Sequence, residues 1–313
     1  MWMYAITSSV SYATTTLKDV LDWANLPTEV TSALPAELLT AILGESNLQC
    51  TSLKTDHVFE YMLITESSEL SQYDLCIDLL KKDISIPHGI LAFAGSGSKF
   101  HGLRDRDWSS PPGNIYLTAS FSPNRRIEHF GPACVALPAV AVVEAIDSVP
   151  ELRGRAGIKW VNDILIEDAK VAGVLTYSQA MGDEITGIVL GIGLNVETSP
   201  DVPPTPFVQR AGAMVDFVED RTAINLSKVL NNLIQRLSEN YTDLQNGGWR
   251  DVIDRYRERS IITGRDVTIL SDSATSTDEV IAEGRIESIG DNLELNLCGF
   301  EKPVSRGRLI LRE

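Results

Sequence analysis

Two lysines stand on either side of a short polar segment that is typical of a hairpin turn. The first lies in the run IKWVND, residues 158–163, and the second opens the run KVAGVL, residues 170–175. If the two runs pair, Lys159 and Lys170 come close together, and like charges at short range repel unless a negative group lies between them. The pair would therefore suit the neutralisation of a bound anion. The alternative is that both lysines point into solvent beside an ordinary Asn-Asp turn.

A second cationic segment lies upstream, in residues 95–108, GSGSKFHGLRDRDW. Its glycines allow a backbone to approach an anion closely, and Lys99, Arg104 and Arg106 can hold carboxylate or phosphate oxygens. The segment contains no Walker A motif, so it is not a P-loop. On composition alone, a flexible surface loop is an equal alternative.

The apolar patterns around these segments predict a mixed α and β domain. Periodicity predicts strands over 58–64, 90–94, 114–121, 158–166, 170–175 and 185–196, and helices over 67–82, 131–149, 222–246 and 249–259. After residue 263 the pattern changes to short strands separated by polar turns, which predicts a small separate β-barrel or sandwich. Residues 1–33 carry no motif, and we expect them to be an N-terminal extension of unknown role.

Charge and cysteine content argue against several classes of function. Asp and Glu outnumber Lys and Arg by 43 to 27, and the resulting net charge of −16 argues against nucleic-acid binding through phosphates. No apolar run reaches the roughly 18–20 residues of a membrane span. The four cysteines form no CxxC pair and the four histidines lack metal-ligand spacing. We expect a reduced, cytoplasmic protein with neither disulfides nor a zinc site.

Taken together, these segments resemble the biotin protein ligases of the biotin/lipoate protein ligase family. The resemblance lies in KWxND, residues 159–163, in KVAGVL, residues 170–175, and in GIGLNV, residues 191–196, which occur in the family's order and spacing. The run RxWxSPxGNxYL, residues 106–117, is similar to the segment after the family's biotin-binding loop. The resemblance extends over about residues 35–313.

This resemblance implies an α+β fold, with a mixed-sheet catalytic domain over residues 34–262 and a small SH3-like β-barrel over residues 263–313. It implies a ligase that uses ATP and Mg²⁺ to activate biotin as biotinyl-5′-AMP. The biotinyl group then passes to a lysine of a biotin carboxyl carrier domain, so the implied partners are that domain and small molecules, and neither nucleic acid nor a membrane. A homodimer is compatible with the resemblance.

The resemblance also implies a role for each matching residue. Lys170 would contact the biotin carboxylate and the α-phosphate and would stabilise acyl transfer, with Lys159 beside it. The nucleotide side would be formed by Trp108, stacked on adenine, and by Lys159, Asn162, Asp163, Lys170 and Asn195, with Asp163 as the ligand for Mg²⁺. The biotin side would be formed by Ser67, Ser68, His101, Gly102, Arg106, Gly173, Gly191 and Gly193.

The loop before Trp108 departs from the family pattern Gly-Arg-Gly-Arg-x-x-Arg-x-Trp. His101 and Leu103 stand where the family has two arginines, and Arg104, one residue from an expected position, is the best candidate for a replacement cation. The departure leaves two alternatives open. One is a sibling ligase that activates lipoate, octanoate or another small acid, and the other is a sensor that binds biotin or its adenylate without turnover. The intact lysine pair argues against the sensor.

Overall fold

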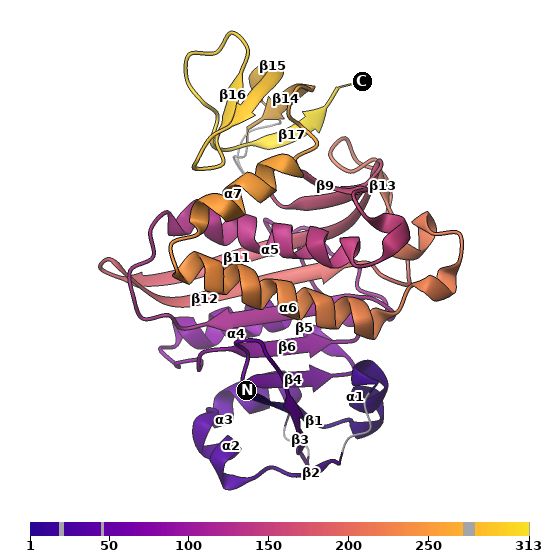
Figure 1. Cartoon of the computed structure of the whole chain (residues 1–313), viewed down its shortest axis with the longest axis vertical. Coiled ribbons are helices and arrows are strands. Elements are labelled where there is room, and N and C mark those ends of the chain that lie inside the picture. Colours follow the sequence, from indigo (N-terminus) through magenta and orange to yellow (C-terminus); the bar gives the residue numbers. More distant parts are fainter. Residues whose placement is uncertain (19–21, 45–46, 272–278, 313) are drawn as a thin grey trace.

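The computed structural model is built on one large mixed β-sheet with helices on both faces (Figure 1). It describes residues 1–18, 22–44, 47–271 and 279–312. The strands of this sheet are β1 (Trp2–Thr7), β2 (Ala24–Asn25), β3 (Gln49–Lys54), β4 (Tyr61–Thr65), β6 (Ile90–Ala94), β8 (Ile115–Phe121), β9 (Ala156–Lys159), β10 (Asp163–Ile166), β11 (Ala169–Met181), β12 (Glu184–Leu194) and β13 (Arg210–Ala211).

The sheet combines a parallel part with an antiparallel part. Its strands follow the order β2-β3-β1-β4-β6-β8-β12-β11-β10-β9, and β13 pairs with β11. β1, β4 and β6 run parallel to one another, whereas β8, β12, β11, β10 and β9 form antiparallel pairs. The mixed sheet expected from the sequence is therefore confirmed.

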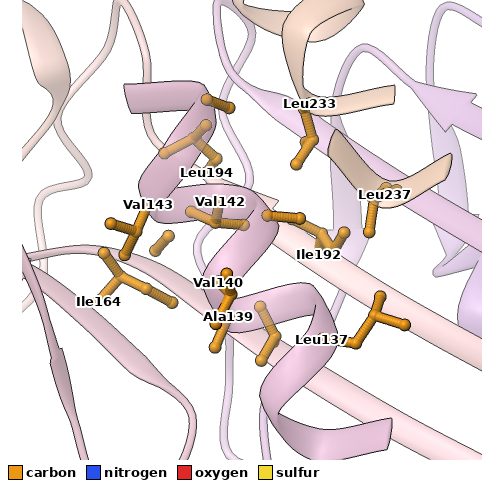
Figure 2. Close-up of a cluster of buried hydrophobic side chains, with 14 of the residues drawn as sticks. Leu137, Ala139, Val140, Val142, Val143, Ile164, Ile192, Leu194, Leu233 and Leu237 are labelled. Atoms are coloured by element: carbon orange, nitrogen blue, oxygen red, sulfur yellow. The ribbon is translucent and has the colours of Figure 1, made fainter. Parts of the chain in front are cut away.

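One face of the sheet is covered by α5 (Phe130–Asp147), α6 (Leu226–Gln245) and α7 (Trp249–Glu258), which cross the sheet in Figure 1. α5 is apolar on nearly all sides because it packs between the sheet and the other two helices. By length and composition alone it could also span a membrane, but most of it is buried in the protein. Figure 2 shows its side chains gathered between β10, β12 and α6, represented by Val142, Ile164, Ile192 and Leu233.

The opposite face is covered by α2 (Thr28–Ala33), α3 (Ala36–Leu43) and α4 (Gln72–Lys81). Alternation along the strands separates the two cores. In β4, Met62 and Ile64 belong to the core under α5, whereas Leu63 between them belongs to the core under α3 and α4. Central strands with two covered faces have no polar side, which explains why β6 is an unbroken apolar run.

The N-terminal residues correct the sequence prediction. We expected residues 1–33 to be an extension outside the catalytic domain. Instead, β1 lies inside the main sheet, antiparallel to β3 and parallel to β4, and α1 (Val10–Leu17) follows it. β1 satisfies the backbone N–H and C=O groups along one edge of β4, which would otherwise remain unpaired. Sequence patterns miss this role because the pairing joins residues far apart in the chain.

The C-terminal residues form a second, antiparallel sheet, which stands at one end of the molecule (Figure 1). Its strands, in the order β16-β15-β14-β17, are β16 (Leu295–Leu297), β15 (Val280–Ile289), β14 (Asp266–Leu270) and β17 (Arg308–Leu311). The small β domain expected here is confirmed. It is joined to the larger sheet by the indole N–H of Trp160, which donates to the carbonyl oxygen of Leu293 at 2.7 Å.

β1 offers two positions for testing whether it belongs to the folded core. The side chain of Ile6 is fully buried, whereas Trp2 on the same strand is 60% exposed. We expect Ile6→Ala to lower the free energy of unfolding by about 2–4 kcal/mol and Trp2→Ala by less than about 1 kcal/mol, because only the first change leaves a cavity. Urea unfolding of both variants measures the difference. Two small and equal losses would show that β1 lies outside the cooperative core.

Candidate active site

A cavity of about 570 Å³ lies beside the antiparallel half of the sheet. Its wall includes strand residues of β8 to β12, the start of α4, residues 100–109, a proline-rich loop around residues 200–208, and residues 307–309 of the small β domain. The cavity gathers most of the residues predicted from the sequence, namely His101, Gly102, Arg106, Trp108, Lys159, Asn162, Asp163, Lys170, Gly173, Gly191, Gly193 and Asn195. Segments far apart in the chain therefore meet at one site.

The two lysines lie where β9, β10 and β11 pair side by side. Asp163, the first residue of β10, is paired with Lys159 at the end of β9 and with Gly173 of β11. The ammonium group of Lys170 reaches the same carboxylate and lies 2.5 Å from Oδ1 of Asp163. Lys170 is therefore paired with Asp163, and Lys159, on the neighbouring strand, adds a second cation near the same carboxylate, so this part of the wall carries a net positive charge.

Lys159 is the more unusual lysine because it is only 6% exposed. Its ammonium group donates a hydrogen bond to the carbonyl oxygen of Phe207 in the proline-rich loop. Burial lowers the pKa of Lys159, Asp163 raises it in opposition, and Lys170 lowers it further. An anionic ligand beside the two lysines would offset both the burial and the repulsion.

Trp108 packs against two paired glycines, Gly173 of β11 and Gly193 of β12. A Cβ atom at Gly193 would lie 2.7 Å from the indole and one at Gly173 would lie 3.1 Å from it, so side chains at these positions would displace the ring. The Nζ atom of Lys170 lies 5.2 Å from the ring centroid, which is within range of a cation–π interaction. We expected the glycines to let the strand backbone face a ligand, and the structure shows that the indole lies against them.

The start of α4 differs from the prediction of a helix from residue 67 onwards. Ser68 lies in β5 (Ser68–Leu70), which pairs with β7 (Gly97–Lys99), and the helix begins only at Gln72. Because this strand takes up the residues before the helix, Ser67 and Ser68 do not line the cavity. The biotin contact that we assigned to these two serines therefore stays a prediction.

Three residues at the start of α4 line the cavity and were missed by the sequence analysis: Ser71, Gln72 and Tyr73. Ser71 caps the helix, because its Oγ atom accepts a hydrogen bond from the backbone N–H of Asp74 at 3.2 Å. The ring of Tyr73 packs against Gly191, where a Cβ atom would lie 2.9 Å from it. The Ser-x-x-Asp pattern at residues 71–74 is a helix-start signal that could have located this end of the helix.

Residues 100–108 form a short hairpin on one side of the cavity, which we call the flap. The N–H of Trp108 donates to the carbonyl oxygen of Phe100 at 2.9 Å, and the N–H of Gly102 donates to that of Arg106 at 2.7 Å. Arg104 stands at the exposed tip with a φ of 63° and is outside the cavity wall, whereas Arg106 is part of it. The role of Arg104 as the cation of this loop therefore stays a prediction.

His101 links the flap to α4. Its Nε2 atom lies 2.8 Å from Oδ1 of Asp74, and its Nδ1 atom lies 2.9 Å from the carbonyl oxygen of Gly102. Both ring nitrogens thus face oxygen acceptors, an arrangement that only the doubly protonated imidazolium satisfies. Burial lowers the pKa of His101, but the Gly102 carbonyl, Asp74 and Asp105 together outweigh burial and raise it.

Buried polar atoms of the cavity wall include some with no hydrogen-bond partner among the residues that the structure describes. Examples are Nε2 of Gln72, Nε1 of Trp108 and Oδ1 of Asn195. Each such buried atom costs about 1–3 kcal/mol when its hydrogen bond is unmade. Their occurrence around one cavity indicates a ligand whose binding, with small side-chain movements, satisfies them.

The carboxylates of the cavity wall are too few to hold a metal ion by themselves, so a metal ion would need further ligand atoms from a bound molecule. In the described ranges, no three His, Cys, Asp or Glu residues come together as a metal site. Mg²⁺ is often held by one or two carboxylates and by the phosphates of a nucleotide. Asp163 fits that arrangement, because its carboxylate lies in the cavity wall, where a bound nucleotide would supply the phosphates.

The same segments carry a family match. Residues 85–195 match the model of the biotin/lipoate A/B protein ligase family. These residues are similar to that family. The bifunctional ligase/repressor BirA of Bacillus subtilis (strain 168) is 26% identical over 214 residues, which cover 67% of this chain and 62% of that protein. The biotin–[acetyl-CoA-carboxylase] ligase of Paracoccus denitrificans is 28% identical over 217 residues, which cover 66% of this chain and 81% of that protein.

The fold of the ligase domain and its surroundings agrees with the sequence match. The structure of the biotin protein ligase from Aquifex aeolicus in complex with biotin and ATP matches with a TM-score of 0.60 at 21% identity, covering 81% of this chain and 99% of that chain. At this identity the likeness shows the fold. The resemblance inferred from KWxND, KVAGVL and GIGLNV is confirmed, and all three motifs contribute to one cavity.

The contact between His101 and Asp74 predicts a pH-dependent stability. A histidine whose pKa is raised in the folded state stabilises that state below its unfolded pKa of about 6.5, and the contribution is lost as the pH rises through the folded pKa. We therefore expect the Tm difference between the wild type and His101→Gln to be largest at acid pH and to shrink above neutrality. Thermal unfolding over a pH series measures it. A difference that is constant with pH would show that His101 does not gain a proton partner on folding.

Proposed function

We propose that this protein is an ATP-dependent ligase that attaches biotin to a lysine of a biotin carboxyl carrier domain. The observation that carries the proposal is the pair of lysines beside Asp163, which pairs with Lys170, in a cavity whose wall contains buried polar atoms without hydrogen-bond partners among the described residues. An acyl-adenylate would bring a phosphate to the lysines and polar groups to those atoms. The names of the relatives, which give biotin, ATP and acetyl-CoA carboxylase, support this choice of substrates.

The reaction would take place in two steps. First, a carboxylate oxygen of biotin attacks the α-phosphorus of ATP, the bond to the bridging oxygen of the β-phosphate breaks, and pyrophosphate leaves. The product is biotinyl-5′-AMP. Second, the neutral ε-amine of the acceptor lysine attacks the carbonyl carbon of this mixed anhydride, AMP leaves with the electron pair of the broken C–O bond, and the amine loses a proton as the amide forms.

Lys170 would stabilise both steps. Negative charge develops on the α-phosphate oxygens in the first step and on the carbonyl oxygen in the second, and a fixed ammonium group in a partly dry site stabilises such charge. Lys159 would neutralise a second phosphate oxygen, and Trp108 would offer its ring to the adenine. The proximity of these three side chains to one another supports the assignment.

Mg²⁺ would accompany ATP, with Asp163 as its protein ligand. When bound, it would supply positive charge to the pyrophosphate that leaves. Asp163 lies in the cavity wall and already balances Lys170, so it can turn between the lysine and a nucleotide-bound cation through rotation of one side chain.

One observation favours a second candidate, a sibling ligase that activates lipoate, octanoate or another small acid. The flap presents Leu103 to the cavity where the family pattern has an arginine, and the charge of His101 is already engaged by Asp74. A less cationic flap suits a more apolar acid. A sensor without turnover has weaker support, because both lysines remain at the cavity.

A panel of acids in ATP–pyrophosphate exchange separates these functions. Biotin, lipoate and octanoate are each incubated with the enzyme, ATP, Mg²⁺ and labelled pyrophosphate, and label entering ATP is counted. Exchange with biotin alone supports the biotin ligase, and exchange with another acid alone supports the sibling. Binding of biotin without exchange of any acid would contradict both ligases.

Lys170→Ala should abolish most of the acyl transfer while leaving the fold intact. The loss of an electrostatic group at the developing charge typically costs about 10²–10³ in rate. Lys99→Ala is the matched control, because Lys99 is an exposed lysine of the same region that pairs with Glu69 outside the cavity. Biotin transfer to a carrier domain, followed by mass spectrometry, measures both variants. Near-normal turnover in Lys170→Ala would contradict the assignment.

A further inference from the structure

Residues 7–12 run from the end of β1 into the first turn of α1. They contact the start of two segments that lead into the cavity wall. The first segment follows β4 and continues into β5 and α4, and the second begins at Gly95 and continues into the flap. The hydroxyl of Thr7 donates to the carbonyl oxygen of Ile64 at 2.8 Å, and that of Ser9 donates to Oε2 of Glu66 at 3.4 Å. Ile64 and Glu66 lie at the end of β4, from which the chain continues into β5 and α4. The N-terminal segment therefore contacts the start of the segment that continues into β5 and α4.

The second segment is contacted more closely, by the hydroxyl of Tyr12 at Gly95. A Cβ atom at Gly95 would lie 1.9 Å from the Oη atom of Tyr12, 2.4 Å from its Cζ atom and 2.7 Å from the carbonyl oxygen of Glu66. Tyr12 is half-buried, and burial raises its pKa. Gly95 directly follows β6 and donates its N–H to the carbonyl oxygen of Thr65 at 3.0 Å. The tyrosine thus stands where β6 turns into the segment that carries the flap.

A short chain of contacts joins Gly95 to the flap. Ala94, Phe100 and Tyr116 form a small apolar cluster with Trp108 packed against it. The rings of Phe100 and Tyr116 meet edge to face with 5.5 Å between their centroids. Phe100 also lies over Gly97, where a Cβ atom would be 2.3 Å from its ring. The flap therefore begins in a cluster that includes Ala94, the residue directly before the contact between Gly95 and Tyr12.

We propose that Tyr12 is a positioning residue. Through its contact with Gly95, it holds the segment from Gly95 to Trp108 in the position over the sheet that binding of the acid substrate requires. Residues 1–17 are then part of the frame of the active site. The proposal rests on the proposed function for its substrate, but its structural part, the ordering of the flap by Tyr12, does not. Tyr12 itself is not a residue of the cavity wall.

Removing the ring of Tyr12 should loosen the flap without changing the chemical groups of the cavity. We expect Tyr12→Ala to raise the KM for biotin about tenfold while kcat changes less, because small misplacements of a binding segment weaken substrate positioning. Tyr4→Ala is the matched control. Tyr4 is a tyrosine of the same N-terminal segment that stacks on Tyr61, with 6.1 Å between the ring centroids, and it is outside the cavity wall.

A double-variant cycle tests the contact itself. Gly95→Ala should raise the KM for biotin, because the new methyl group collides with the tyrosine. In Gly95→Ala/Tyr12→Ala the methyl group gains space, so the KM should rise by less than the product of the two single effects. The recovery should be partial, since the Glu66 carbonyl remains close to the same position. Independent, multiplying effects would overturn the proposal.

Hydrogen exchange of the ligand-free protein tests the proposal without any activity. The amides of residues 95–108 should exchange faster in Tyr12→Ala than in the wild type or in Tyr4→Ala, with no matching change in α5. Equal exchange in all three proteins would overturn the role of Tyr12, whatever the enzyme does. Failure of the wild type to support ATP–pyrophosphate exchange would instead overturn the proposed function. If Tyr12→Ala does not fold, the KM for biotin and the hydrogen exchange of residues 95–108 are measured in Tyr12→Leu and Gly95→Ala instead.

Discussion

Lys159 and Lys170 lie near a single carboxylate, Asp163, which pairs with Lys170, in a wall where Lys159 is almost fully buried. Burial of Lys159 lowers its pKa through desolvation, and Lys170 lowers it further because like charges repel. The folded chain tolerates this arrangement because Asp163 offsets part of it and because the Phe207 carbonyl accepts a hydrogen bond from Lys159. A phosphate would complete the balance. The site is thus selective for an anion before any other contact is considered.

The rest of the structure holds this charge arrangement in place. The pairing of β9, β10 and β11 sets the lysines against Asp163, and the apolar face below these strands is anchored by α5. On the cavity side, paired glycines admit the indole of Trp108 close to the strands. Small residues on the strands and a large apolar helix behind them therefore serve one purpose, because together they fix the distance between the sheet, the ring and Lys170.

Local sequence patterns were sufficient to predict the lysines and Asp163 at the centre of the site, but not the residues at its edge. The lysines and Asp163 could be found because short hairpins bring neighbours in sequence together, so motif and geometry coincide. The start of the helix was predicted too early because β5 exists only through its pairing with β7, a contact between segments about 30 residues apart that no local pattern reveals. Burial of Gln72 depends on the same packing. The integration of β1 was missed for the same reason, since β1 pairs with β3 and β4, and the helices α1, α2 and α3 lie between β1 and these strands in the sequence.

A structure of the protein crystallised with biotin and ATP tests the central claim most directly. The account predicts an acyl-adenylate in the cavity, with a phosphate oxygen within hydrogen-bond distance of Lys170, the adenine beside Trp108, and partners supplied to at least one of Gln72 and Asn195. Asp163 should keep its place between the lysines or turn toward the nucleotide. Nucleotide bound elsewhere on the protein, or a cavity occupied by a ligand that leaves both lysines without an anionic contact, would contradict the account.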